Sequence, residues 1–368
     1  MVPGGHLLAG SLEPALSGPP TSALLRATEW GHEELIVHHD RESGLRCVIA
    51  IHDTTLGVAA GGTRMRVYPS LDEATTDALR LARAMTYKSA MAEMPFGGGK
   101  AVILGDPARD KTRALLAAYA RVIDHLGGRF NTGCDMGMDE RDMAVLSRLT
   151  RHVQHAPAGQ RLDTADLAAL GVFESIRAAA IVLGRGLDGL RVAVQGLGNV
   201  GLHLARRLAA AGAQLVVADV DRARAERAVD ELHALAVDPA AIYDVEADVF
   251  SPNAAGGVVN DETVSRLRCR AVVGGANEQL AEPRHGDALH SRGILYGPDY
   301  VANAGGLLSL VYDTEGADDD TVRARVVGIG PRLREIWDRA RAENLAPHRM
   351  ADRMAEERLA AARQGRSR

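Results

Sequence analysis

Cysteine, aromatic residues and long hydrophobic runs are all scarce in this chain of 368 residues. Its three cysteines, Cys47, Cys134 and Cys269, lie far apart and form neither a CxxC pair nor a disulfide framework, which is typical of a reducing compartment. No apolar run approaches the roughly 20 residues that span a bilayer. No long basic run accompanies the formal net charge of −5. We therefore expect a soluble, cytoplasmic protein that binds neither membrane nor nucleic acid.

Length and composition favour a globular protein of about two domains. Hydrophobic residues make up 46% of the chain and charged residues 25%, both usual values. Residues 1–24 contain Gly, Pro and Ser but no basic segment followed by an apolar core, so we predict a disordered or variable extension, not a signal peptide. The histidine pairs, such as His38 and His39, have no ligand-spaced partner, and we expect no metal site.

A glycine motif joins two predicted strands in the second half of the chain. A buried strand over 191–195 is followed by Gly-Leu-Gly-Asn-Val-Gly at 196–201, by a helical pattern, and by a second strand over 215–218. A lone GxGxxG is a weak signal, because glycine is common here. The order strand, glycine turn, helix, strand is the dinucleotide-binding fingerprint of a Rossmann fold.

Each position of the motif has a physical role in binding a pyrophosphate. Gly196 permits the tight turn, Gly198 lets the backbone approach the phosphates, and Gly201 allows the helix to pack closely on the strand. Asn199 and Val200 offer free N–H groups at the positive end of the helix. The alternative is a glycine-rich turn that binds nothing.

Asp219 ends the second strand and indicates the cofactor. Its carboxylate would accept hydrogen bonds from the ribose hydroxyls and repel a 2′-phosphate, which favours NAD over NADP. Arg222 and Arg224 follow closely and weaken that preference. We expect the pattern to continue with a helix over 222–235 and strands over 248–250 and 272–275.

Two lysines stand out in the first half, where nearly all other basic residues are arginine. Lys88 lies near the end of a helix that Ser70 opens, and Lys100 follows three glycines at the start of a strand over 101–104. Two ammonium groups held together in an apolar neighbourhood lower each other's pKa, so one can act as a base while the other binds a carboxylate. The alternative is a pair of surface lysines beside a flexible loop.

At these residues the sequence resembles the leucine, phenylalanine and valine dehydrogenases of the glutamate dehydrogenase superfamily. The resemblance covers roughly residues 34–357 in one order. It is carried by GGTRM at 61–65, MTYKSAMAEMPFGGGKAVI at 85–103, FSPNAAGG at 250–257, GGANEQL at 274–280 and GILYGPDYVANAGG at 293–306.

The resemblance implies an NAD-dependent, reversible oxidative deamination of an L-amino acid to a 2-oxo acid and ammonia. Lys88 would bind the substrate α-carboxylate, and Lys100 would be the general base that activates water. Asp135 would exchange protons with the amino nitrogen; by itself it looks like a turn or capping residue. Gly61 and Gly62 would lie against the substrate.

Ala60 bears on the substrate class. Glutamate dehydrogenases carry a lysine just before the Gly-Gly pair, where it meets the substrate's side-chain carboxylate. Alanine cannot pair that charge, so an apolar side chain, branched or aromatic, is favoured over glutamate. The chain departs from the family in a shortened crossover loop, in Ala168 where a threonine contacts the nicotinamide amide, and in Cys134 where an acidic residue is usual.

Four further residues follow strands or turns of the nucleotide-binding half. Asn253, Ala254 and Asn277 stand after predicted strands, and Asn303 lies within VANAGG. Ligands of such sheets bind at the carboxyl ends of strands, so we expect these residues to contact the cofactor. Isolated asparagines are also common in turns, which is the alternative.

The predicted fold is α/β with two domains and a cleft between them. A substrate and oligomerisation domain would span residues 25–152 together with C-terminal helices at about 321–360, kinked at 330–331. A Rossmann-like NAD-binding domain would span 153–320. We expect a homo-oligomer. Two other functions fit the same residues: the fold acting on an unusual amino or keto acid, and a catalytically impaired NAD-binding protein.

Overall fold

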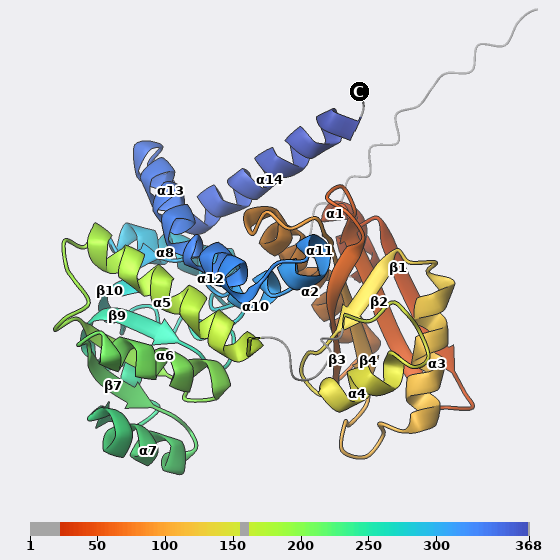
Figure 1. The fold of residues 1–368 in the computed structure, drawn as a ribbon, viewed down its shortest axis with the longest axis horizontal. Helices are drawn as coiled ribbons and strands as arrows, with labels where there is room; N and C mark the ends of the chain where they lie inside the picture. The colour runs from red at the N-terminus through yellow and green to blue at the C-terminus, as the bar shows by residue number, and fades with distance from the viewer. Residues whose placement is uncertain (1–22, 155–161, 367–368) are drawn as a thin grey trace, which may run out of the picture.

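The computed structural model describes residues 23–154 and 162–366, which form two lobes, each built around one sheet (Figure 1). The sheet of the first lobe has the order β1-β2-β4-β3-β5. Its first two pairings are antiparallel, and β3 runs parallel to both β4 and β5. The strands are β1 (Glu34–Asp40), β2 (Leu45–Asp53), β3 (Ala59–Arg66), β4 (Gly97–Leu104) and β5 (Phe130–Gly133).

Both faces of this first sheet are covered by helices. Ile49 of β2 belongs to the apolar cluster on the side of α3, whereas its neighbour Val48 belongs to the cluster on the side of α2, because successive side chains point to opposite faces. Ser70 caps α2 by accepting a hydrogen bond from the amide of Glu73, as the sequence predicts. The helices are α1 (Ala23–Glu29), α2 (Leu71–Met91), α3 (Arg113–His125) and α4 (Glu140–Leu146).

The second lobe is built around a parallel sheet of the order β11-β10-β9-β6-β7-β8. The strand order reverses between β6 and β9, which is the Rossmann arrangement, and ligands of such sheets bind where it reverses. The strands are β6 (Arg191–Gln195), β7 (Gln214–Ala218), β8 (Leu235–Ala236), β9 (Glu246–Pro252), β10 (Arg268–Val272) and β11 (Leu295–Tyr296). The helices are α5 (Thr164–Val182), α6 (Asn199–Ala210), α7 (Arg222–Leu232), α8 (Pro283–Ser291), α9 (Asp299–Ala302), α10 (Gly305–Leu308) and α11 (Val311–Glu315), with the 3₁₀ turn η1 (Ile242–Asp244).

Three C-terminal helices connect the lobes: α12 (Asp319–Val327), α13 (Ile329–Ala342) and α14 (Pro347–Arg366). Helix α14 returns to the first lobe and lies by α2 (Figure 1). There Arg358 donates hydrogen bonds of 2.9 and 3.2 Å to the carbonyl oxygens of Ala90 and Met91, and it pairs with Glu93. The C-terminal end of α2 is therefore capped by a helix that follows it by more than two hundred residues.

Several sequence predictions need correction. Helix α7 ends at Leu232 instead of 235, because His233 adopts a left-handed conformation (φ 54°) and the chain then forms β8. The strand predicted over 272–275 ends at Val272, and its glycines follow it. The C-terminal helix breaks at Gly328, not at 330–331, because Pro331 sits in the first turn of α13, where no amide donor is needed.

Some boundaries stay predictions. The extension over 1–24 lies outside the described residues except for Ala23 and Leu24, which begin α1. The shortened crossover loop also lies largely outside them, at 155–161, so the division at 152–153 stays a prediction. Among the helices that the structure describes, none is long and apolar enough to cross a bilayer.

Candidate active site

The two lysines and the aspartate converge from three elements of the first lobe. Lys88 lies near the C-terminal end of α2, Lys100 lies in β4, and Asp135 follows β5. Lys100 and Asp135 form an ion pair. Lys88 donates a hydrogen bond of 2.7 Å to the side-chain oxygen of Asn303 in the second lobe. The arrangement differs from a surface pair, because the side chain of Lys100 is only 8% exposed.

Burial and charge set the protonation of these groups. Burial lowers the pKa of Lys88 to about 8, and Lys100 adds to that shift while Asp299 and Asp135 oppose it. Burial also lowers the pKa of Lys100, although its partner Asp135 opposes this. For Asp135 burial alone would raise the pKa, but Lys100 and Arg64 outweigh it and bring the pKa to about 2. The site therefore holds a carboxylate beside lysines that lose their protons more easily than usual.

The two glycines of GGTRM allow neighbouring backbone segments of the site to pack closely. A Cβ at Gly61 would overlap the carbonyl oxygen of Gly99, and one at Gly62 would overlap the carbonyl oxygen of Cys134 and lie 2.9 Å from the Cβ of Asp135. Gly62 thus lets the Asp135 loop approach β3. Ala60 is fully buried in β3, paired with Gly98 and Asn131.

A cavity of about 310 Å³ lies between the lobes and contains both lysines. Its apolar wall comes mainly from α2 and from the loops after β10 and β11. Arg64 and Arg80 face it from the first lobe, and Asn277, Glu278 and Asp299 from the second. Apolar lining residues include Leu81, Ala84, Met85, Leu280, Pro298 and Tyr300.

The glycine turn has the geometry of a phosphate cradle. Gly196 has a φ of 89°, and a Cβ on it would lie 2.7 Å from that of Ala254. A Cβ on Gly201 would overlap the carbonyl oxygen of Gly196, so the helix must approach the strand closely there. A Cβ on Gly198 would meet only the end of the Arg224 side chain, 3.8 Å away, and no side chain caps the first amides of α6. These features fit a dinucleotide pyrophosphate.

Asp219 lies beside this turn at the end of β7. Its carboxylate accepts hydrogen bonds of 2.6 Å from the amide of Leu197 and 2.8 Å from that of Asp221. Its side chain is only 5% exposed, and Arg224 approaches to 4.0 Å. A cavity of about 280 Å³ between the turn and α7 is lined by Arg224 and Arg227.

Asparagines connect the glycine turn to the lysines. The side-chain oxygen of Asn253 accepts a hydrogen bond of 2.8 Å from the amide of Gly275. The side-chain amide of Asn303 donates to the carbonyl oxygen of Gly275 at 3.3 Å and to the side-chain oxygen of Asn277 at 2.7 Å. Since Asn303 also accepts from Lys88, hydrogen bonds link Asn253, Asn277 and Asn303 through Gly275 to Lys88. Their role as cofactor contacts stays a prediction.

Sequence reasoning missed the charged groups around this centre. Arg64 bonds to Asp135, and Asp77 and Arg80 extend from it toward Glu278. Asp299 is half-buried near Lys88, and burial raises the pKa of its carboxyl group. The one available signal was Arg64, a charged residue inside the small-residue segment GGTRM.

Comparison with known proteins supports the same reading of the fold. The model of the "Glu/Leu/Phe/Val dehydrogenase, dimerisation domain" matches residues 32–152, and that of the "Glutamate/Leucine/Phenylalanine/Valine dehydrogenase" matches residues 217–366. The leucine dehydrogenase of Geobacillus stearothermophilus is 44% identical over 342 residues, 92% of this chain and 93% of the relative. This chain belongs to the Glu/Leu/Phe/Val dehydrogenase family.

Solved structures of this amino acid dehydrogenase family share the whole architecture. The crystal structure of L-tryptophan dehydrogenase from Nostoc punctiforme has a TM-score of 0.79 at 40% identity, covering 92% of this chain and 99% of that one. The hetero-hexameric glutamate dehydrogenase of Thermus thermophilus has a TM-score of 0.75 at 26% identity, covering 94% and 95%. The two-lobed α/β fold predicted from the sequence is thereby confirmed.

The structure describes the surroundings of two residues at which the sequence departs from the family pattern, Ala168 and Cys134. Ala168 lies on α5 against the backbone of Gly305 and Gly306. Cys134 is exposed as a residue, but its sulfur lies 3.5 Å from the Glu140 carboxylate; partial desolvation of the sulfur and the charge of Glu140 raise the pKa of the thiol to about 12. Neither change alters the ion pair between Lys100 and Asp135.

Proposed function

We propose that the protein catalyses the NAD-dependent, reversible oxidative deamination of an apolar L-amino acid to its 2-oxo acid and ammonia. One observation carries the proposal: Lys88 and Lys100 line the cavity between the first lobe and the lobe built on the Rossmann sheet, and Lys100 is in direct contact with Asp135. Leucine and tryptophan dehydrogenases among the relatives support this class of substrate.

Lys88 binds the substrate α-carboxylate in this proposal. Its ammonium group has three donors, of which one is directed to Asn303, so two can meet a carboxylate. A bound carboxylate also compensates the cost of burying the ammonium charge, because an opposite charge nearby favours the charged form.

Lys100 and Asp135 move the protons. A nicotinamide bound between the lobes would supply the acceptor for the hydride of the substrate Cα, so that the deprotonated amine would become an iminium, a protonated imine. Lys100, whose pKa lies below its ordinary value, takes a proton from the water that attacks the imine carbon. Asp135, held as a carboxylate beside it, takes up and returns protons at the amino nitrogen.

The second lobe holds the cofactor. Backbone amides at the start of α6 face the pyrophosphate, and Asp219 faces the ribose hydroxyls of the adenosine. Asn253, Ala254, Asn277 and Asn303 surround the nicotinamide end. Asp219 selects NAD over NADP, because its carboxylate would repel a 2′-phosphate.

The substrate side chain is apolar. Ala60 stands where glutamate dehydrogenases place a lysine, so the chain offers no partner there for a second carboxylate. Leu81, Ala84 and Met85 add an apolar wall to the cavity beside Lys88. A glutamate carboxylate placed against these apolar residues would lose its solvation without meeting the lysine that Ala60 replaces.

The first lobe is also the surface for a second copy of this chain. Its family model is that of a dimerisation domain, and β1 is an edge strand of its sheet. Val37 on that strand is 55% exposed, and Val67 and Leu71 nearby are 66% and 50% exposed. Light scattering should give a mass of two or more chains, and a Val37→Asp variant should dissociate; a monomeric wild type would refute this assembly.

A substrate panel tests the proposed reaction. Apolar, aromatic and acidic L-amino acids are each incubated with NAD or NADP, and the absorbance of the reduced nicotinamide is followed. Turnover of apolar amino acids with NAD, and little of glutamate, is expected. Activity confined to an unusual amino acid would support the first alternative, and NAD binding without any turnover would support the second.

A further inference from the structure

A row of alternating charges runs from the active site across the boundary between the lobes. We call it the charge chain. Each member contacts the next through an ion pair, and the sign of the charge alternates throughout. In order, its members are Lys100, Asp135, Arg64, Asp77, Arg80 and Glu278.

Arg64 occupies the centre of the charge chain with its planar guanidinium fixed at two points. Its Nε lies 3.2 Å from Oδ2 of Asp135, and its Nη1 lies 3.1 Å from Oδ2 of Asp77. Asp77 is itself held by the hydroxyl of Tyr68 at 2.6 Å and by Arg80 at 2.8 Å. Because the donors of a guanidinium have a fixed geometry, the position of Asp77 sets the position of Asp135.

The far end of the charge chain belongs to the second lobe. Arg80 pairs with Glu278, which has a left-handed backbone conformation (φ 55°) that non-glycine residues seldom adopt. The carbonyl oxygen of Glu278 accepts a hydrogen bond of 2.7 Å from the amide of Gly257. Glu278 is therefore held at this place by its backbone.

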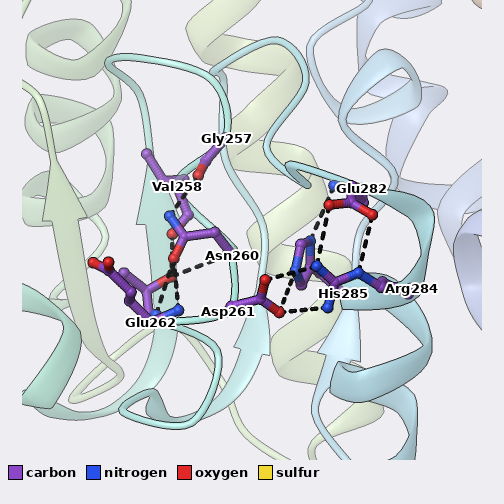
Figure 2. A network of polar contacts seen from close by, with 9 residues as sticks. Gly257, Val258, Asn260, Asp261, Glu262, Glu282, Arg284 and His285 are labelled. Atoms are coloured by element: carbon purple, nitrogen blue, oxygen red, sulfur yellow. Dashed lines mark hydrogen bonds and ion pairs between the residues drawn. The ribbon is translucent and has the colours of Figure 1, made fainter.

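The loop that begins at Gly257 is braced in turn. Asn260 donates a hydrogen bond of 2.9 Å back to the carbonyl oxygen of Gly257. Figure 2 shows the neighbouring Asp261 directed at Arg284 and His285, which lie 2.6 and 3.2 Å from its carboxylate. The second lobe thus presents Glu278 to Arg80 from a rigid support.

We propose that Arg64 is a positioning residue that holds the Asp135 carboxylate against Lys100, and that Glu278 completes this arrangement when the two lobes meet. This inference rests on the proposed function, since it names how the proton-transferring pair of that reaction is kept in place. Arg64 and Lys100 both contact Oδ2 of Asp135, so Arg64 keeps that oxygen beside Lys100 when the lysine loses its charge during turnover.

The electrostatics of the centre agree with this role. The charged groups that face Lys100 are Asp135, Arg64, Asp77 and Lys88. Among them Arg64 lowers the pKa of Lys100 and also helps to lower that of Asp135. Removing Arg64 should therefore raise the pKa of both groups, and Lys100 would be a poorer base at neutral pH.

The test compares Arg64→Met, Arg64→Lys and Glu278→Gln with exposed controls. Arg64→Met should lower kcat by about 10²-fold, the effect of misplacing a reacting group, with little change in KM because Lys88 still binds the carboxylate. The kcat of Arg64→Lys should lie between that of the wild type and that of Arg64→Met, because an ammonium group keeps the charge but cannot contact both aspartates. Glu278→Gln should lower kcat by about 2- to 5-fold, as expected of a half-exposed ion pair.

The controls and the double variant decide the coupling. Arg109→Met and Glu231→Gln, which break exposed ion pairs elsewhere, should leave kcat unchanged. In an Arg64→Met background, Glu278→Gln should have no further effect. If Glu278→Gln lowered kcat in the Arg64→Met background as much as it does in the wild type, the coupling would be refuted. A normal kcat in Arg64→Met, or a change in KM alone, would refute the positioning role.

A labelling experiment separates this inference from the proposed function and does not depend on turnover. The chain has three lysines, Lys88, Lys100 and Lys111, so acetylation by acetic anhydride can be assigned to each by mass spectrometry. In folded Arg64→Met, checked by its melting curve, labelling of Lys100 should require a higher pH than in the wild type. An unchanged labelling profile would overturn the role of Arg64, whereas a wild type inactive on every amino acid would overturn the function alone.

Discussion

The ammonium group of Lys88 on α2 reaches across to the second lobe and donates a hydrogen bond of 2.7 Å to Asn303. Asn303 is hydrogen-bonded in turn to Asn277 and to the backbone of Gly275, which lies just beyond the carboxyl end of β10. A ligand that binds Lys88 therefore competes with, or adds to, a contact that holds the lobes together. Substrate and cofactor binding should be thermodynamically coupled through this pair.

Removing Lys100, the proposed base, should lower turnover strongly and leave cofactor binding intact. Lys100→Ala is expected to lower kcat by about 10²- to 10⁴-fold, the usual contribution of a general base, while NADH binding measured by fluorescence stays normal. Lys100→Arg should be equally inactive, since a guanidinium keeps its charge and cannot accept a proton. Near-normal turnover in either variant would exclude Lys100 as the base.

Lys88→Met should inactivate the protein and stabilise it. A pKa of about 8 in the folded state, against about 10.4 in the unfolded state, costs about 3 kcal/mol of stability at neutral pH. The cost is full below pH 8 and disappears as the pH rises past the unfolded value, because the buried group is then neutral in both states. The gain in melting temperature should therefore shrink between pH 8 and pH 10.

Lys111→Met should have the opposite effect on stability to Lys88→Met. Lys111 donates to the carbonyl oxygen of Gly137 at 3.0 Å and to Asp142 at 2.6 Å, so its loss removes two good contacts. This variant should melt at a lower temperature than the wild type. If Lys88→Met also melted lower at neutral pH, the buried charge would not carry the cost assigned to it.

Asp219→Ala should weaken NAD binding and spare NADP. Loss of hydrogen bonds to a charged group predicts a 10- to 100-fold increase, roughly, in the Kd of NADH, whereas NADPH loses no favourable contact. Fluorescence titration with both cofactors measures this, and Asp110→Ala, in an exposed ion pair of the first lobe, is the control. Unchanged NADH affinity would contradict the ribose contact.

Gly62→Ala should disrupt the site through packing alone. A methyl group there would overlap the Cys134 carbonyl and press on Asp135, and overpacking of this kind costs about 1–3 kcal/mol. Melting temperature and kcat should both fall. Gly186→Ala is the matched control, because nothing lies within 4 Å of a Cβ at that position and its φ is ordinary; equal behaviour of the two variants would argue against the close approach.

The fold could be predicted where local patterns match tertiary burial. The strands on either side of the glycine motif, the Ser70 cap and the helix Arg113–His125 all follow from periodicity and end signals. Prediction failed where the backbone conformation of one residue sets the end of a helix. The left-handed His233 and the helix break at Gly328 leave little trace in hydrophobic spacing.

The site was predictable only in its motif-bearing parts. Lys88 and Lys100 were visible because a lysine beside glycines in an apolar stretch is unusual. Arg80 and Glu278 were not, because they are separated by nearly two hundred residues and look like any solvated charges until the lobes meet. Long-range pairing of this kind has no local signature in a single sequence.

The return of α14 to α2 has a consequence for biosynthesis. The carbonyl groups that end α2 receive their donors from Arg358, 268 and 267 positions further along the chain. While the ribosome is still translating the parallel sheet, this end of α2 has only its local hydrogen bonds, such as that from the amide of Glu93 to the carbonyl oxygen of Ala90. The C-terminal end of α2 thus gains these contacts only once α14 has been made, and a nascent chain stalled before α14 emerges should leave that end of α2 more open to protease.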